Sequence, residues 1–206
     1  QNALEDAIDK FLLKGNKTKT SHTKDLSIVS FHECGHALSM ILSGLPVARI
    51  SIIPNTSGVG GMVVREDQDH MFLTKDQLEK EIISLYAGRA AEELIFGRDF
   101  ITNGASNDIS VAKEQLKSYV LDYGFSEKIG MAETEDSDAV QEEINRLSFV
   151  FYNKAKKNTY QISDIFLLFY YYQTLLKGGL VIGISFFKST LIMIGIYLIL
   201  KYGMER

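Results

Sequence analysis

The sequence predicts a mostly α-helical domain with one small β-hairpin, and three observations lead to this fold class. Apolar residues recur at helical spacing in successive segments up to about residue 158. Residues 47–53 and 61–64 are instead rich in β-branched side chains, and a Pro-Asn-Thr-Ser-Gly turn at 54–58 separates them. No internal repeat is visible along the chain.

Composition sets limits on the class of protein. A length of 206 residues suits one domain, or a domain with an appendage. The net charge of −4 gives no reason to expect nucleic acid as a partner. The single cysteine excludes an internal disulfide and a cysteine-rich zinc site, and it fits a reducing compartment. The chain opens on a polar, acidic segment without a signal peptide or an initiator methionine, so we expect it to be part of a longer polypeptide.

The first half of the chain predicts two helices and the hairpin. A short amphipathic helix around residues 4–11 and a polar linker at 15–21 come first. The next helix is expected to have Thr23 as its cap and to end at Gly44, with Pro46 behind it. The hairpin follows this helix directly. Its edge can pair with an extended peptide by strand addition, or the hairpin can simply cover the core, and the pattern favours neither.

The second half predicts further helices with recognisable ends. Thr74 and Gln77 form a capping box that opens a long helix ending at Gly97. Ser106 or Asn107 is expected to cap the following helix. That helix should close at residue 124, and another should run over 138–157. A separate, very apolar helix capped by residue 163 is expected to extend to 176.

The stretch His32-Glu33-Cys34-Gly35-His36 lies inside the helix that begins near residue 23. Because four residues make slightly more than one turn, His32 and His36 project from the same face. Two such imidazoles can bind one zinc ion, and Glu33 can reach a water bound to it. Cys34 points to nearly the opposite side and is expected to be a packing residue. A chance pair is the alternative reading, but a chain with only four histidines seldom contains this motif by accident.

A catalytic zinc ion usually has three protein ligands, so a third is required. His22 and His70 lie in polar segments and are expected to be loop residues. The carboxylates of Glu92, Glu93 and Asp108 are the stronger candidates. Acidic residues at a helix start also contribute roughly 0.3–1 kcal/mol to helix stability, which gives Asp108 a purely structural explanation. The glycine-containing turn before Asp108 favours a functional role, but the pattern alone leaves the choice open.

Several motifs occur in a consistent order along the chain. They are HECGHAL at 32–38, LTK at 73–75, AGRAAEELIFG at 87–97, TNGASNDI at 102–109 and YGFSE at 123–127. In this order and spacing the chain resembles the peptidase domain of the FtsH-type proteases, which are membrane-anchored, ATP-dependent zinc enzymes. The similarity covers about residues 4–177 and is strongest from 32 to 131.

The resemblance implies a set of site residues. It makes His32, His36 and Asp108 the ligands of one zinc ion per chain and Glu33 the catalytic base. Glu92 then becomes the candidate for a second carboxylate that orients an imidazole through its free N–H, although it can also serve only to hold helices together. The predicted function is that of a zinc-dependent endopeptidase.

The resemblance also implies partners and a domain arrangement. Substrates would be unfolded or membrane polypeptides, delivered by a homo-hexameric ATPase ring. The peptidase domain would lie on a reducing aqueous side of a membrane, the bacterial cytoplasmic face or an organellar equivalent. These 206 residues contain no Gly-x-x-x-x-Gly-Lys-Ser/Thr loop, so ATP is expected to act only through an ATPase module outside this chain. We expect residues 1–22 to be the end of that module with a linker, and 23–177 to be the peptidase domain.

Residues 178–206 form an apolar tail that does not match the family. As a helix, residues 178–200 extend over about 34 Å, which is enough to cross a bilayer core. Lys188 lies in the middle of this segment, where a charge costs about 2.5–3.5 kcal/mol. Membrane insertion and packing against a core or a partner are both open.

Two other functions fit parts of the sequence. A catalytically silent, zinc-stabilised helical scaffold for assembly or membrane attachment needs the ligands but not Glu33, so the intact glutamate argues against it. A zinc hydrolase acting on a small substrate is the other alternative. The hairpin beside the motif helix favours an extended peptide over a compact ligand.

Overall fold

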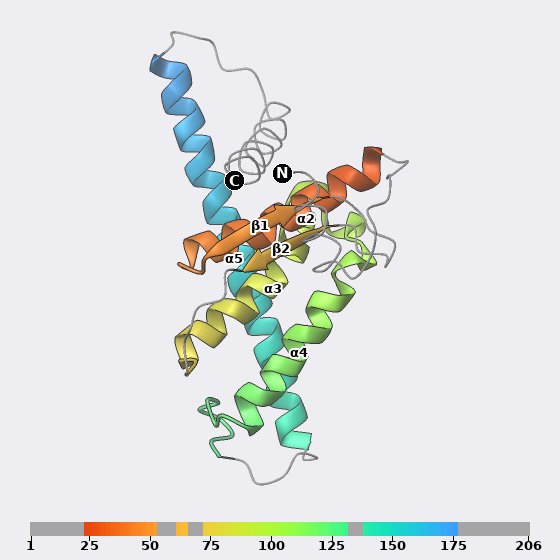
Figure 1. Ribbon diagram of the computed structural model, residues 1–206, viewed down its shortest axis with the longest axis vertical. Helices are drawn as coiled ribbons and strands as arrows, with labels where there is room; N and C mark the ends of the chain where they lie inside the picture. Colours follow the sequence, from red (N-terminus) through yellow and green to blue (C-terminus); the bar gives the residue numbers. More distant parts are fainter. Residues whose placement is uncertain (1–22, 53–60, 66–71, 132–137, 177–206) are drawn as a thin grey trace, which may run out of the picture.

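The computed structural model describes residues 23–52, 61–65, 72–131 and 138–176. It confirms a mostly helical domain with a small two-stranded sheet (Figure 1). In chain order the elements are α2 (Thr23–Leu42), β1 (Val47–Ser51), β2 (Met62–Arg65), α3 (Lys75–Phe96), the 3₁₀ turns η1 (Arg98–Phe100) and η2 (Asn103–Ala105), α4 (Ser106–Leu121) and α5 (Asp138–Leu176).

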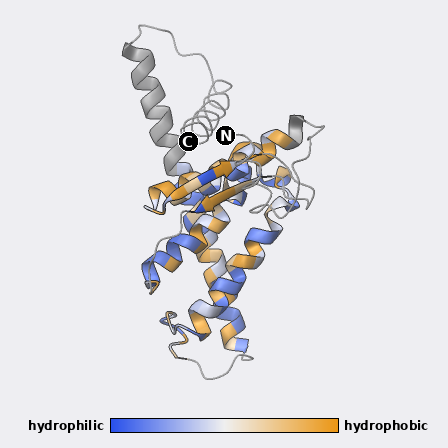
Figure 2. Ribbon diagram, viewed as in Figure 1, coloured by the Kyte–Doolittle hydropathy of each residue, from blue (hydrophilic) through white to orange (hydrophobic). Residues whose placement is uncertain are grey.

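Helix α3 is the centre of the described fold. It packs against α2 on one side and against α4 and α5 on another (Figure 1). Ile82, Leu116 and Phe151, one from each of α3, α4 and α5, are almost completely buried, and burial of side chains of this size stabilises the fold by about 1.5–3 kcal/mol each. Orange and blue residues alternate along α4 in Figure 2, as expected for a helix with one buried face.

Helices α2 and α3 approach each other closely at Gly35. A Cβ atom built on Gly35 would lie 2.5 Å from the carbonyl oxygen of Ala87 and 2.7 Å from Cβ of Ala91. Only a residue without a side chain fits this crossing, and the small residues of α3 complete it. The crossing therefore sets the position of the His-Glu-x-x-His turn on the surface of α3.

The predicted end of α2 and both predicted ends of α3 are confirmed. The N–H of Gln77 donates to Thr74 Oγ1 at 3.2 Å, and the N–H of Thr74 donates to Gln77 Oε1 at 2.9 Å, which is a complete capping box. Gly44 and Gly97 follow the ends of α2 and α3 with φ of 74° and 92°, a region that favours glycine. The proposed cap Thr23 is the first described residue of α2.

The expected cap of α4 is wrong. Ser106 is already the first residue of α4, Asn107 lies within its first turn, and the N-cap position is Ala105, which makes no side-chain cap hydrogen bond. The reason is that η2 runs directly into α4, so the capping side chain lies one turn earlier. There, Thr102 Oγ1 accepts the N–H of Gly104 at 3.1 Å.

The predicted break between two helices at Ser163 is also wrong. A single helix, α5, runs from Asp138 to Leu176. Its sequence contains neither glycine nor proline, so nothing interrupts the backbone hydrogen bonds. A serine that suits a cap position does not by itself end a helix that continues on both sides.

The two predicted strands pair as an antiparallel hairpin. Ser51 lies opposite Met62 and Ile50 opposite Val63, with an irregular register between residues 47 and 49. The predicted turn at 54–58, the helix and linker before residue 22, and the apolar tail from 178 lie outside the described residues. Within the described ranges, no helix combines the length and apolarity that a membrane crossing requires.

Candidate active site

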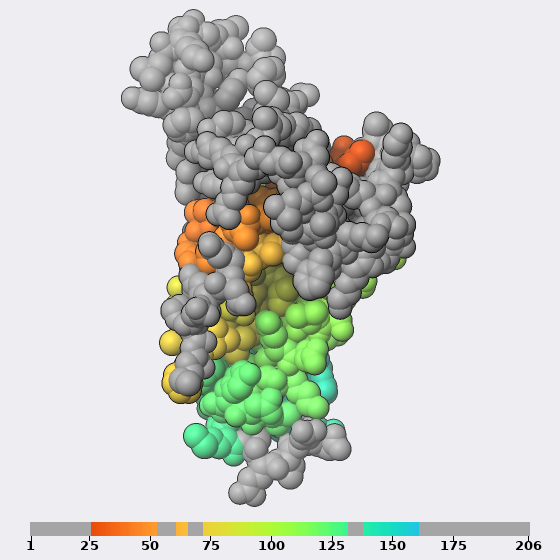
Figure 3. Space-filling view, viewed as in Figure 1, coloured from red at the N-terminus to blue at the C-terminus, as the bar shows by residue number. Residues whose placement is uncertain are grey.

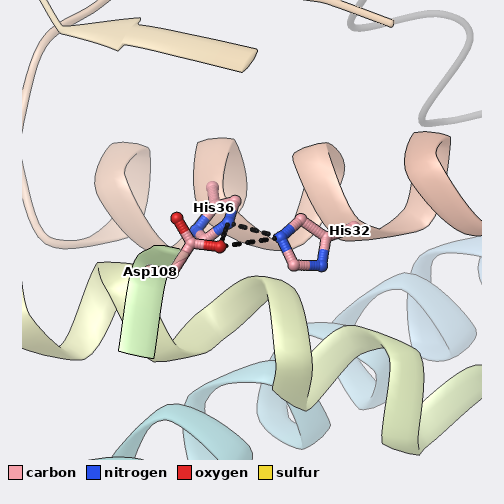
Figure 4. Close-up of side chains that lie close together, drawn as sticks. All are labelled: His32, His36 and Asp108. Atoms are coloured by element: carbon pink, nitrogen blue, oxygen red, sulfur yellow. Dashed lines mark hydrogen bonds and ion pairs between the residues drawn. The ribbon is translucent and has the colours of Figure 1, made fainter. Parts of the chain in front are cut away.

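The two motif histidines and Asp108 meet at one point (Figure 4). His32 and His36 come from successive turns of α2, and Asp108 comes from the first turn of α4. The Nε2 atoms of the two histidines are 3.0 Å apart, and Oδ2 of Asp108 lies 3.1 Å from Nε2 of His32 and 3.5 Å from Nε2 of His36. Ligand atoms about 2.0–2.1 Å from a tetrahedral zinc ion are about 3.3–3.4 Å apart, so these spacings suit such an ion.

The hydrogen bonds of the two Nδ1 atoms determine which ring nitrogens face the point where the histidines meet Asp108. Nδ1 of His36 lies 2.7 Å from the carbonyl oxygen of Ser84, which can only accept, so this Nδ1 carries the hydrogen. Nδ1 of His32 lies 2.6 Å from Glu92 Oε1 and donates to that carboxylate. In the neutral rings both Nε2 atoms therefore present lone pairs. Two nitrogen lone pairs and a carboxylate oxygen directed at one point form a donor set that fits a divalent zinc ion.

Glu92 connects the motif helix to the turn that precedes Asp108. One carboxylate oxygen contacts His32, and the other accepts the backbone N–H of Thr102 at 2.7 Å. The Arg89 guanidinium donates to the carbonyl of the same Thr102 at 2.7 Å. The Glu92 side chain is 1% exposed, and its burial alone would raise its pKa, but the bonds from His32 and Thr102 lower the pKa below its usual value. Glu92 is thus an ionised, buried link between α3 and two parts of the site.

Glu33 is buried beside the three candidate ligands but does not belong to that group. Its side chain lies against Gly61, where a Cβ atom would come within 2.7 Å of Glu33 Cγ. A cavity of about 520 Å³ opens there, and its lining includes Glu33, His32, His36 and Asp108 together with residues 61–63 of the hairpin. The surface is hollowed over α3 between the hairpin and α4 (Figure 3).

The protonation equilibria of the site are strongly perturbed. Burial, opposed by the two imidazoles, raises the pKa of Glu33 to about 7. Burial disfavours a charged His32, but its hydrogen bonds to Asp108 and Glu92 outweigh this and raise the pKa of His32 to about 9. Burial likewise opposes ionisation of Asp108, yet the bonds from both histidines hold its pKa well below the usual range. A proton and a metal ion therefore compete for the same imidazole nitrogen.

The structure brings five of the residues singled out from the sequence to one cavity, and they are His32, Glu33, His36, Glu92 and Asp108. The remaining candidate carboxylate, Glu93, faces α5 instead, where Tyr152 and Lys156 donate to it. Cys34 is buried, as expected of a packing residue, and burial raises the pKa of its thiol to about 11. His22 and His70 lie outside the described residues.

Two contributors were missed from the sequence, Ser84 and Thr102. Both act through backbone groups, which every residue carries, so their side chains give no signal. The position of Ser84 could nevertheless have indicated its role, because it lies one helical turn before Gly88 on the face of α3 that meets α2. Thr102 opens the Thr-Asn-Gly turn that leads to Asp108.

A His-Glu-x-x-His helix facing a carboxylate from a distant helix is the arrangement of a metallopeptidase-type centre. Comparison with known proteins agrees with this class. The model of peptidase family M41 matches residues 19–164, and the chain belongs to this family. Its peptidase domain is of the FtsH type, as the motif order predicted.

The similar curated proteins are much longer than this chain. It is 44% identical over 121 residues to an ATP-dependent zinc metalloprotease FtsH of Lancefieldella parvula, covering 57% of this chain and 18% of that protein. It is 37% identical over 127 residues to the protein of the same name in Haemophilus influenzae, covering 60% and 20%. An ATP-dependent zinc metalloprotease YME1 homolog of Schistosoma mansoni is 32% identical over 156 residues, covering 70% and 24%. The chain thus spans about a fifth of the length of these relatives.

Proposed function

We propose that this chain is the zinc-dependent endopeptidase part of an ATP-dependent protease. The convergence of the two Nε2 atoms and Oδ2 of Asp108, at spacings suited to a tetrahedral ion, is the observation that supports it most. His32, His36 and Asp108 would hold the metal. When bound, zinc lowers the pKa of a coordinated water toward about 7 and polarises the scissile carbonyl.

Glu33 is the general base of this proposal. Its carboxylate lies in the same cavity as the ligands, and burial holds its pKa at about 7, close to the value that suits a base at neutral pH. It accepts a proton from the attacking water and then passes that proton to the leaving amine. A silent scaffold does not need a buried carboxylate at this position, since burying it costs free energy without a structural partner.

The hairpin supports an extended polypeptide as the substrate. Gly61, Met62 and Val63 line the cavity, so β2 runs beside the proposed metal position. In the described two-stranded sheet, β2 pairs with β1 along one edge only. An extended segment of an unfolded or membrane protein can add to the other edge through backbone hydrogen bonds, which do not depend on its sequence. The apolar side chains of Ile28, Val29 and Leu85 line the same cavity and suit apolar substrate side chains.

The proposal includes the arrangement of the whole protein. Residues 1–22 would be the end of an ATPase module with a linker, residues 23–177 the peptidase domain, and 178–206 a tail that inserts into a membrane or packs on a partner. The names of the relatives support an ATP-dependent enzyme. A homo-hexameric ring of ATPase modules would deliver substrates at a membrane, on its reducing aqueous side.

Incubation with a fluorescently labelled unfolded protein tests the activity. We expect release of labelled fragments that stops with a zinc chelator and returns when zinc is added back. If zinc binds but neither the protein nor short peptides are cleaved, the chain is a silent scaffold. If only small amides or dipeptides are hydrolysed, it is a small-substrate hydrolase.

A further inference from the structure

Gly88 of α3 lies directly against the two imidazoles of the proposed metal site. A Cβ atom built on Gly88 would lie 2.5 Å from Nε2 of His36, 2.6 Å from Nε2 of His32 and 2.7 Å from Cε1 of His32. All three distances are far inside van der Waals contact. The two closest atoms are the nitrogens whose lone pairs face the metal position, so the missing side chain leaves space at the metal centre itself. Figure 4 shows α3 running beside the three ligands.

The backbone does not explain a glycine at this position. Gly88 lies in the interior of α3 and is not among the described glycines with positive φ. Three of its buried neighbours on the helix, at positions 87, 90 and 91, are alanines. Alanine is a better helix former than glycine, so helix stability alone favours alanine at 88 as well. The reason for glycine at 88 is therefore the space that the two imidazole rings occupy against it.

The rings cannot move away from a methyl group without losing their present arrangement. The Nδ1 atom of His32 is held by Glu92 at 2.6 Å, and that of His36 is held by the Ser84 carbonyl at 2.7 Å. The rings also contact each other edge to face, with centroids 4.7 Å apart. Displacing either ring breaks its Nδ1 bond or separates the two Nε2 atoms.

We propose that Gly88 is a positioning residue that forms the floor of the metal site, so that any side chain at 88 strongly weakens metal binding while the helices remain folded. This inference rests on the proposed function, because it takes His32 and His36 to be metal ligands. It differs from the role of Gly35, whose Cβ would meet the backbone of Ala87 rather than a ring. Gly35 serves the contact between α2 and α3, and Gly88 serves the metal.

The two glycines provide a matched test in the full 206-residue chain. Zinc affinity is measured by competition with a chromophoric chelator, and the melting temperature is measured with and without zinc. Gly88→Ala is expected to keep the metal-free melting temperature near that of the wild type, to weaken zinc binding about a hundredfold or more, and to lose the zinc-induced rise in melting temperature. Gly35→Ala is expected to melt at a lower temperature even without zinc, because its clash is with backbone.

Wild-type zinc affinity in Gly88→Ala overturns the inference and leaves the proposed function standing. Failure of the wild type to bind zinc overturns the proposed function instead. If Gly88→Ala does not fold, His32→Ala/His36→Ala is compared with the same double variant carrying Gly88→Ala. An equal or higher melting temperature with Gly88→Ala supports the inference, since the rings alone occupy the space and alanine is the better helix former. A further loss caused by Gly88→Ala in the absence of both rings contradicts it.

Discussion

Glu92 and Glu93 are adjacent residues whose carboxylates serve different parts of the molecule. Glu92 bonds His32 and the N–H of Thr102 in the site, whereas Glu93 accepts from Tyr152 and Lys156 of α5. Successive residues of a helix point about 100° apart, so one faces α2 and the other faces α5. Glu92 therefore belongs to the candidate site, whereas Glu93 belongs to the packing of α3 against α5.

Glu92→Gln should weaken zinc binding by about 10- to 100-fold, because a neutral amide is a poorer acceptor for the His32 Nδ1–H and orients the ring less firmly. Glu93→Gln is the matched control. It should lower the free energy of unfolding through its lost contacts with α5 and leave zinc affinity unchanged. Zinc titration of both variants checks this, and equal affinities in the two variants would refute a metal-positioning role for Glu92.

Zinc affinity should rise with pH. In the metal-free protein, the pKa of His32 is raised to about 9 by its bonds to Asp108 and Glu92, which outweigh burial. Below that value the ring holds a proton that zinc must displace, so affinity should increase by up to about tenfold per pH unit between pH 6 and pH 8. Chelator competition at several pH values measures this, and a constant affinity over that interval would contradict the assignment of His32 as a ligand.

Glu33→Gln should separate binding from catalysis. The amide is nearly isosteric and leaves the three ligands in place, but it cannot accept the proton of the attacking water. We expect zinc affinity within a few-fold of the wild type and loss of proteolysis. Normal cleavage of an unfolded protein by this variant would remove Glu33 from the mechanism.

Some residues of the candidate site could be predicted from the sequence, and others could not. The spacing of His32 and His36 on a helix determines their common face, so the pair was predictable from the helical period. The choice between Asp108 and the two glutamates was not, because it depends on where the start of α4 meets α2. The Ser84 carbonyl and the space above Gly88 were not predictable either, since both arise only when α3 lies against the rings.

Among the elements, α3 connects the site to the core. One face carries Gly88 and Glu92 toward α2, and other residues, including Ile82, belong to the cluster shared with α4 and α5. The start of α3 is held by the capping box of Thr74 and Gln77. Local signals of this kind predicted the end of α2 and both ends of α3 correctly. The predicted cap at residue 106 failed because the 3₁₀ turn η2 runs directly into α4. The predicted helix start at residue 163 failed because α5 contains no glycine or proline that would interrupt it.

Thr74→Ala should lower the free energy of unfolding by about 1 kcal/mol, because Thr74 Oγ1 no longer accepts the N–H of Gln77 at the start of α3. Thr74→Ser keeps a hydroxyl and should retain most of the stability. Denaturant unfolding of the three proteins measures the difference. Equal loss in the alanine and serine variants would mean that the capping hydroxyl does not contribute.

At the scale of the whole molecule, the described domain brings the candidate ligands and the candidate base to one cavity, but the chain spans only about a fifth of its relatives. The cavity lies beside a strand edge, and the proposed substrate, an extended chain, could pair with such an edge whereas a folded one could not. Unfolding of substrates would then depend on the ATPase module of the full-length protein.

If the ATPase module unfolds substrates and this chain only cleaves them, the behaviour of the chain on its own can be predicted. It should cleave a permanently unfolded protein slowly and leave the same protein intact when a disulfide or ligand keeps it folded. Gel analysis of both forms over time checks this. Cleavage of the folded form at a similar rate would show that the chain does not depend on an unfolding partner.

Binding of one zinc ion by His32, His36 and Asp108 together underlies the proposed activity. Diffraction from zinc-loaded crystals, recorded on both sides of the zinc absorption edge, tests it most directly. We expect one anomalous peak per chain, at about 2.0–2.2 Å from the two Nε2 atoms and an Asp108 carboxylate oxygen. A peak bound by other residues, or an Asp108 carboxylate turned away from an ion held by the two histidines, would contradict it.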